Sequence, residues 1–277
     1  MRKTLLICIS FFLMVTAIFR KVYKDTNRFK VNNVEFVTNK IPVGSNFTIL
    51  QLTDIHNKVF GENNEELIAT IKSRDADIIV ITGDLIDRLT EEFDHAFHLI
   101  EKLVAINEKV YYVSGNHECD HPHKELFFAG LKERKVTILD NTNELVNING
   151  VTFQLVGVAN ASTGHHQLSR ALANIKNDYY TVLLSHAPNI IDEYHDASVD
   201  LTLCGHTHGG QIRLPLVGAI VGPDNTFFPK LDKGTFELDP NQYLYIDSGL
   251  GTTARPIRFM NQSQFSFITV KHEREKG

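Results

Sequence analysis

The stretch LTLCGHTHGG, Leu201–Gly210, combines a strand with an unusual pair of histidines. Its first four residues, LTLC, are mostly apolar and have the length and composition of a buried strand. His206 and His208 follow one residue apart, with glycines on both sides. A lone histidine after a strand is most often a half-buried core residue, but glycine removes the side chain where the backbone bends tightly or another group approaches closely. The stretch therefore predicts a strand that ends at a functional site.

Apolar runs of strand length recur along the chain and alternate with helical patterns. The expected strands cover residues 47–52, 76–82, 109–114, 151–158, 179–185, 199–204 and 242–247, and the expected helices cover 62–74, 91–107, 122–134, 166–176 and 188–195. This alternation predicts an α/β sandwich. NING at 147–150 predicts a hairpin turn, so part of the sheet is antiparallel. We expect one mixed sheet or two.

Polar residues that can bind a metal ion or take part in catalysis directly follow five of these strands. They are Asp54 and His56; Asp84 and Asp87; Asn116, His117 and Glu118; His186; and His206 and His208. Each motif alone is common as a turn. In α/β folds, however, sites form in the crevice outside the carboxyl ends of the strands. The whole set, in order and always at the exit of a strand, therefore predicts one cleft.

The potential ligands in this set are two carboxylates, one amide and four imidazoles, with no thiolate: Asp54, Asp84, Asn116, His56, His186, His206 and His208. Nitrogen and oxygen ligands suit Mn, Fe or Zn. Seven ligands exceed the need of one ion with an open position, but they suffice for two ions that share a carboxylate. Two metals about 3.5–4 Å apart suit in-line displacement at phosphorus.

Charge is distributed unevenly along the 277 residues. The first 30 residues carry seven basic side chains and Asp25, a net of +6, whereas the whole chain carries −5, which leaves −11 for the remainder. An acidic body argues against nucleic acid as the main partner, because binding a phosphate backbone needs a cationic face. A basic leader suits an anionic membrane surface.

The leader contains sixteen uncharged residues, Thr4–Phe19. As a helix they would span about 24 Å, less than a hydrocarbon core of about 30 Å. Val15–Ala17 is a weak cleavage site, since no polar segment precedes it. We expect an uncleaved cell-membrane anchor at 1–20, a linker and lead-in at 21–46 with an edge strand at 32–38, and the main domain at 47–277. The heavier basic cluster after the helix favours a cytoplasmic body, but short anchors that export their domain begin the same way, so both sides of the membrane stay open.

The ordered series D-x-H (54–56), G-D-x-x-D (83–87), G-N-H-E (115–118), His186 and G-H-x-H (205–208) resembles the calcineurin-like metallophosphoesterase superfamily. GHTHGGQIRLP, together with the leader, is similar to its bacterial membrane-anchored branch of phosphodiesterases and UDP-diacylglucosamine pyrophosphatase-like enzymes. The resemblance implies a four-layer α/β/β/α sandwich of two mixed sheets, which agrees with the pattern of strands and helices.

The resemblance also implies two divalent ions, Mn, Fe or Zn, with Mn favoured. The first would be held by Asp54, His56, Asp84 and His208. The second would share Asp84 and add Asn116, His186 and His206. A hydroxide between the metals would attack phosphorus.

The resemblance implies other roles for three further residues of these motifs. His117 would not be a ligand but would protonate the leaving oxygen, and an imidazole pKa near 6.5 suits that work. Asp87 and Glu118 would orient ligands and backbone.

Serine/threonine protein phosphatases of this superfamily have glycine where Leu89 stands and arginine where Ser114 stands. These two differences disfavour a protein phosphatase.

We therefore expect a two-metal hydrolase acting on a phosphodiester or pyrophosphate of an envelope lipid or nucleotide-linked substrate. Alternatives are a phosphomonoesterase of the same fold, or a non-catalytic, metal-stabilised binding protein of the membrane surface. The apolar stretch Leu214–Gly222 is either a buried loop or the wall of a lipid site. Arg255 and Arg258 are candidate contacts for a substrate phosphate, or members of surface salt bridges. The oligomeric state is left open.

Overall fold

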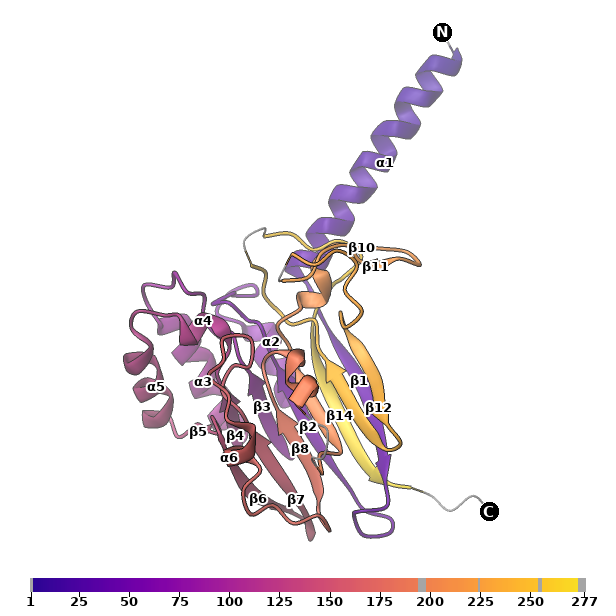
Figure 1. Cartoon of the computed structure of the whole chain (residues 1–277). Helices are drawn as coiled ribbons and strands as arrows, with labels where there is room; N and C mark the ends of the chain where they lie inside the picture. The colour runs from indigo at the N-terminus through magenta and orange to yellow at the C-terminus, as the bar shows by residue number, and fades with distance from the viewer. Residues whose placement is uncertain (1, 194–197, 224, 254–255, 274–277) are drawn as a thin grey trace.

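Two mixed β-sheets, each of six strands, form the centre of the computed structural model (Figure 1). The structure describes residues 2–193, 198–223, 225–253 and 256–273. One helix, α1 (Arg2–Asn27), projects from the body. The predicted sandwich of two mixed sheets is thereby confirmed.

The first sheet has the order β1-β14-β2-β3-β4-β5. Its strands are β1 (Phe29–Thr38), β14 (Ser263–His272), β2 (Asn46–Leu52), β3 (Ile78–Thr82), β4 (Val110–Val113) and β5 (Thr137–Ile138). All neighbouring pairs are parallel except β14 and β2. β1 lies at the edge and contains the strand expected at 32–38, so part of the segment expected to be a linker belongs to this sheet.

The second sheet has the order β12-β13-β9-β8-β7-β6. Its strands are β12 (Gly234–Asp239), β13 (Gln242–Ile246), β9 (Leu201–Cys204), β8 (Tyr180–Leu184), β7 (Val151–Gly157) and β6 (Thr142–Ile148). The two outer pairs are antiparallel and the inner pairs are parallel. Asn149 and Gly150, both with positive φ, form the hairpin turn between β6 and β7, as predicted.

Helices cover the outer face of each sheet. On the first sheet they are α2 (Glu65–Lys72), α3 (Asp94–Ile106) and α5 (Lys124–Glu133), with the short α4 (Asn116–Cys119) at the strand ends. On the second they are α6 (Leu168–Ala171) and the 3₁₀ helix η1 (Pro188–Glu193). The remaining short elements are η2 (His208–Gly210) and the ribbon of β10 (Arg213–Leu214) and β11 (Gly218–Ala219).

The helix expected at 166–176 is wrong in length. Only four of those residues form α6, and turns follow, with Asn174 in the left-handed region at φ 64°. Asparagine tolerates this conformation, which ends a helix. The segment expected as a helix at 188–195 is a 3₁₀ helix to Glu193, and its last two residues lie outside the described residues.

Alternate residues of the central strands face two different cores. In β3, Ile78 and Val80 pack between the sheets, whereas Ile79 and Ile81 pack against the helices. A strand buried on both faces therefore reads as a continuous apolar run. Between the sheets, the rings of Phe47 and Phe153 stack with centroids 4.1 Å apart and an interplanar angle of 6°.

α1 is longer than the expected anchor, because it continues past residue 20 and its last turn packs on the body. Its 26 residues span about 39 Å at 1.5 Å per residue. An eighteen-residue apolar window of α1 is entirely unburied. The helix has the length and composition of a membrane-spanning helix, and a signal sequence can have the same. Asp25 and Thr26, in contrast, are buried. Thr26 Oγ1 accepts a hydrogen bond from Arg258 N at 2.8 Å, and Asp25 Oδ2 accepts one from Asn261 N at 3.3 Å.

Replacing Phe153 by alanine should destabilise the full chain by about 3–5 kcal/mol, because it removes a buried ring from the inter-sheet core. Denaturant unfolding followed by circular dichroism in detergent would measure this. Phe228→Ala, which removes an exposed ring, is the matched control and should change the stability by less than about 0.5 kcal/mol. Equal effects of the two substitutions would contradict this packing.

Candidate metal centre

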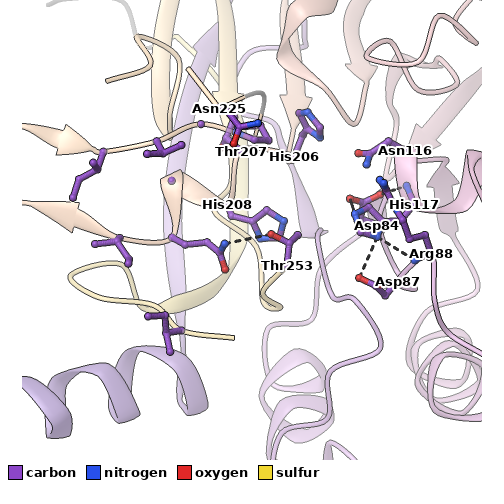
Figure 2. Close-up of a pocket in the computed structure, with 18 of the residues that line it drawn as sticks. Asp84, Asp87, Arg88, Asn116, His117, His206, Thr207, His208, Asn225 and Thr253 are labelled. Carbon is purple, nitrogen blue, oxygen red and sulfur yellow. Dashed lines mark hydrogen bonds and ion pairs between the residues drawn. The ribbon is translucent and has the colours of Figure 1, made fainter. Parts of the chain in front are cut away.

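The ends of β2, β3, β4, β8 and β9 bring the seven predicted ligands together. They are Asp54, His56, Asp84, Asn116, His186, His206 and His208. Figure 2 shows part of this set, with the imidazoles of His206 and His208 in the same cleft as Asp84 and Asn116. The parallel strands of both sheets therefore deliver their polar ends to one place.

The first group of ligand atoms belongs to Asp54, His56 and His208. His56 Nε2 lies 3.1 Å from His208 Nε2, and His208 Nε2 lies 3.3 Å from Asp54 Oδ1. His56 Nε2 is also 3.6 Å from Asp84 Oδ2. Two imidazole nitrogens and two carboxylates thus point at a common centre.

The second group surrounds His186 Nε2. This atom lies 3.1 Å from Asp84 Oδ2, 3.2 Å from Asn116 Oδ1 and 3.1 Å from His206 Nδ1. His186 Nδ1 lies 2.8 Å from the carbonyl oxygen of Thr82 and donates to it, which leaves a lone pair on Nε2 of the neutral ring. In that neutral form four electron-rich atoms meet, and their close contact requires a cation, either a proton or a metal ion, among them.

Electrostatics at His186 agree with this requirement. Burial alone lowers the pKa of His186, but Asp84, Asp54 and the Thr82 carbonyl outweigh it and raise the pKa to about 10. The site thus favours positive charge at this point. The donor set fits divalent ions, because it offers nitrogen and oxygen ligands and no thiolate.

The two carboxyl groups differ in their proton affinity. Burial, with the nearby Asp84 carboxylate, raises the pKa of Asp54 to about 7 although His186 opposes the rise. Burial also acts to raise the pKa of Asp84, but His186, His56 and His117 outweigh it and hold the pKa well below its usual value. Asp84 Oδ2 lies 3.6 Å from His56 Nε2 and 3.1 Å from His186 Nε2, within reach of both groups of candidate ligand atoms.

Five of the seven ligand residues have a left-handed backbone, although none is glycine. The φ angles are 49° at Asp54, 50° at His56, 50° at Asp84, 69° at His206 and 50° at His208. Such conformations cost free energy and cluster at functional sites. The clustering of these conformations at the strand ends supports a functional site there.

Gly205 and Gly115 stand where the backbone passes closest to the carboxylates. A Cβ at Gly205 would lie 2.0 Å from Thr53 Oγ1 and 2.3 Å from Asp54 Oδ2. One at Gly115 would lie 2.1 Å from Asp84 Oδ1. These distances explain the glycines of the G-H-x-H and G-N-H-E motifs, because any side chain would displace a ligand.

His117 lies beside the ligands. Its Nδ1 accepts a hydrogen bond from Arg88 N at 3.1 Å, so the proton of the neutral ring is on Nε2, which lies 3.9 Å from Asp84 Oδ2. Burial lowers the pKa of His117 against the opposing effect of Asp84 and Asp87. Asp87 Oδ2 lies 3.2 Å from His117 Nδ1 and 3.7 Å from His56 Nδ1, close to both rings.

Glu118 organises the backbone around the ligands. Its carboxylate accepts hydrogen bonds from the backbone N–H groups of Asp84 at 3.0 Å, Gly115 at 2.9 Å and Ile86 at 3.1 Å. Burial is the largest cause that raises the pKa of Glu118 to about 7. One side chain thereby joins the loops that carry Asp84 and Asn116.

Arg258 was expected from the sequence to contact a substrate phosphate, but the structure places it in the interior. Its side chain is fully buried, and its guanidinium donates to the carbonyl oxygens of Ser248 at 2.6 Å and Gly251 at 2.6 Å. These bonds hold the loop beside Asp54, whose carbonyl oxygen accepts from Gly251 N at 2.6 Å. The other expected arginine contact, Arg255, lies outside the described residues.

Asn261 supports the site and was not predicted from the sequence. Its Nδ2 donates to the carbonyl oxygen of His208 at 2.6 Å, and its Oδ1 accepts from Lys233 Nζ at 2.8 Å. It precedes β14, more than fifty positions after His208, and stands in no motif. No spacing signal could have indicated it.

Four of the candidate ligands, Asp84, Asn116, His206 and His208, line a cleft of about 1000 Å³. His117 and Arg88 also line it (Figure 2). Its apolar lining residues are Ile212, Ile220, Val221, Phe227 and Ile257. The stretch 214–222 thus contributes to the wall of the cleft through its last residues.

The chain belongs to the calcineurin-like phosphoesterase family, whose model matches residues 47–210. It is accordingly a metal-dependent phosphoesterase, and the family implies divalent metal ions. The matched region contains all seven residues that converge in the cleft.

Bacterial relatives match most of the chain. The uncharacterized metallophosphoesterase YkoQ of Bacillus subtilis is 29% identical over 271 residues, which cover 95% of this chain and 98% of YkoQ. YkuE of the same organism is 30% identical over 244 residues, 83% of this chain and 82% of YkuE. Among solved structures, the NAD nucleotidase NadN of Haemophilus influenzae aligns with a TM-score of 0.48 and 15% identity over 74% of this chain and 45% of NadN.

Gly205→Ala should remove bound metal, because its methyl group would press on Thr53 and Asp54. We expect the metal content of the purified full chain to fall from about two ions to one or fewer. Elemental analysis after dialysis against Mn²⁺ would measure this. Gly164→Ala introduces strain at φ +71° with no neighbour within 4 Å, and it controls for general destabilisation. Full metal content in Gly205→Ala would show that the close approach does not matter.

Proposed function

We propose that this protein is a membrane-anchored two-metal hydrolase that cleaves a phosphodiester or pyrophosphate bond in a lipid or nucleotide-linked substrate. The observation that carries the proposal is the cleft, whose lining includes four of the seven metal-ligand candidates together with apolar side chains. Such a cleft accommodates a substrate with bulky groups on both sides of the reacting phosphorus. α1 supplies the proposed anchor.

Two sets of residues would hold the ions. Asp54, His56 and His208 belong to the first and Asn116, His186 and His206 to the second, with Asp84 common to both. When bound, two divalent cations supply a water of lowered pKa and neutralise negative charge at phosphorus. The nitrogen and oxygen donors suit Mn, Fe or Zn, and Mn is the ion to test first.

His117 would donate the proton to the leaving oxygen. In the neutral ring, Arg88 N donates to Nδ1. In the imidazolium, the form that acts as an acid, Nδ1–H would instead face Asp87 Oδ2 at 3.2 Å while Nε2–H faces the centre. A general acid contributes about 10²–10⁴-fold to a rate when the leaving group needs a proton. Burial lowers the pKa of His117, so its proton-donating imidazolium form would be favoured as the pH falls.

A diester or pyrophosphate is favoured over a phosphoprotein. Ser114 stands before Gly115, and its backbone N–H donates to Asp140 Oδ1 at 2.8 Å. Arg88 is half exposed at the cleft, and its Nη2 lies 3.6 Å from Asp120 Oδ2. The Asp120 carboxylate thus partly offsets the positive charge of Arg88. A phosphomonoester dianion needs more positive charge at its binding site than a diester does, so this arrangement favours a diester.

His117→Ala should keep its metal yet lose activity in a way that depends on the leaving group. We expect a loss of about 10²–10⁴-fold on a diester with an alkoxide leaving group, and a much smaller loss on bis-p-nitrophenyl phosphate, whose phenolate leaves without a proton. Steady-state kinetics of the full chain in detergent with Mn²⁺ would measure both losses. His95→Ala, on the exposed face of α3, is the matched control.

Other outcomes separate the alternatives. Equal losses on both diesters would remove His117 from the role of proton donor. A preference for p-nitrophenyl phosphate would indicate a phosphomonoesterase. Bound metal without turnover of any ester would identify a non-catalytic binding protein.

Asp84→Asn should abolish both metal binding and hydrolysis, because it removes the shared negative charge from both groups of ligands. Elemental analysis alongside the kinetic assay would separate this variant from His117→Ala. Retention of two ions by Asp84→Asn would contradict the shared role of this carboxylate.

A further inference from the structure

We infer that a contiguous apolar surface beside the base of α1 lies in the interface of a lipid bilayer. This surface, the apolar rim, consists of Leu214, Leu216, Val217, Phe227, Phe228, Ile257 and Met260. The inference rests on the proposed function and extends it, because it specifies the side from which a substrate enters the cleft.

The rim concentrates exposed apolar side chains. Outside α1, twelve large hydrophobic residues of the described part of the chain are exposed, and seven of them belong to the rim. Leu216, at the tip of the ribbon between β10 and β11, is fully exposed, and Phe227 is 69% exposed. Single exposed apolar residues are ordinary, but a contiguous group marks a contact surface.

Backbone bonds join the three segments of the rim into one surface. Ile212 and Phe259 form a bridge, as do Val221 and Phe227. The backbone N–H of Phe228 also donates to the carbonyl oxygen of Ile220 at 3.0 Å. The side chains of the rim are therefore held together by the fold.

The rim adjoins the end of α1. Ile257 and Met260 flank the segment whose Arg258 N donates to Thr26 Oγ1, at the last turn of the helix. Asn261, the next residue after Met260, contacts Asp25. Figure 1 shows β10 and β11 at the end of the body from which α1 leaves.

The last turns of α1 have the composition of a membrane–water boundary. Tyr23 is 66% exposed, and Arg20 and Lys24 are exposed beside it. Aromatic side chains gather at this depth of a bilayer, and basic side chains favour anionic headgroups. If the apolar part of α1 spans a bilayer, this boundary places the adjacent rim at the level of the headgroups and the first carbons of the acyl chains.

The cleft opens within the rim. Phe227 and Ile257 belong to the rim and also line the cleft that ends at the ligands. An acyl chain could therefore remain among apolar side chains while its phosphate reaches the metal centre. The substrate class that fits is a phosphodiester or pyrophosphate carrying acyl chains, taken directly from the bilayer.

A single tryptophan can test the rim, because the natural chain has none. Full-length Leu216→Trp would be reconstituted in liposomes containing phosphatidylglycerol, with and without brominated lipid. We expect brominated lipid to quench most of its emission and aqueous iodide to quench little. Leu145→Trp, on β6 and 48% exposed in the natural chain, is the matched control and should show the opposite response.

Two results would overturn the inference. Quenching of Leu216→Trp by iodide but not by brominated lipid would place the rim in water. Protection from both quenchers would mean that protein covers the rim, as in contact with a second copy of the chain, and cross-linking would then identify that copy.

The double variant Leu216→Ser/Val217→Ser tests the entry of the substrate. We expect hydrolysis of an acyl-chain diester in liposomes to fall by about tenfold or more, since the lost apolar side chains no longer enter the bilayer. Hydrolysis of soluble bis-p-nitrophenyl phosphate should be unchanged. Equal rates of the natural chain and the variant on the lipid would overturn the entry route, whereas absence of hydrolysis of both substrates by the natural chain would instead refute the proposed function.

Discussion

The burial of two carboxylates, those of Asp54 and Asp84, is the constraint on which the rest of this structure depends. Both are essentially unexposed, and a buried charge is costly unless it is paired. Their partners are imidazoles that also need their lone pairs satisfied. A cluster of this kind is stable when cations occupy its centre. The surrounding fold is arranged to bring these electron-rich atoms together.

The arrangement has a cost in backbone conformation, and other residues offset it. Five ligand residues adopt left-handed φ, which only a well-determined environment maintains. Glu118 supplies part of that environment by accepting three backbone N–H groups, and Asn261 supplies another part through the carbonyl oxygen of His208. The backbone around the centre is therefore held by residues outside the set of candidate ligands.

Much of this was readable in the sequence because it depends on local order. Apolar runs determine the strands, and polar residues at their ends must meet once the strands are parallel, so the seven ligand candidates were found together. The ends of α6 and α1 were harder to predict from the sequence. The turn at Asn174 after α6 and the burial of Asp25 in the last turn of α1 both depend on tertiary packing. Arg258 was misread because burial of a guanidinium depends on the carbonyl groups that surround it.

The helix α1 enters the body without an intervening flexible segment, and this has a mechanical consequence. Its last turn is packed on the residues that precede β14, and β1 begins two residues after the helix ends. A domain joined in this way cannot swing on a tether. If α1 spans a membrane, as proposed, the tilt of the helix would set the orientation of the body, so that a change in membrane thickness would tip the whole molecule and change the angle at which the cleft meets the lipid surface.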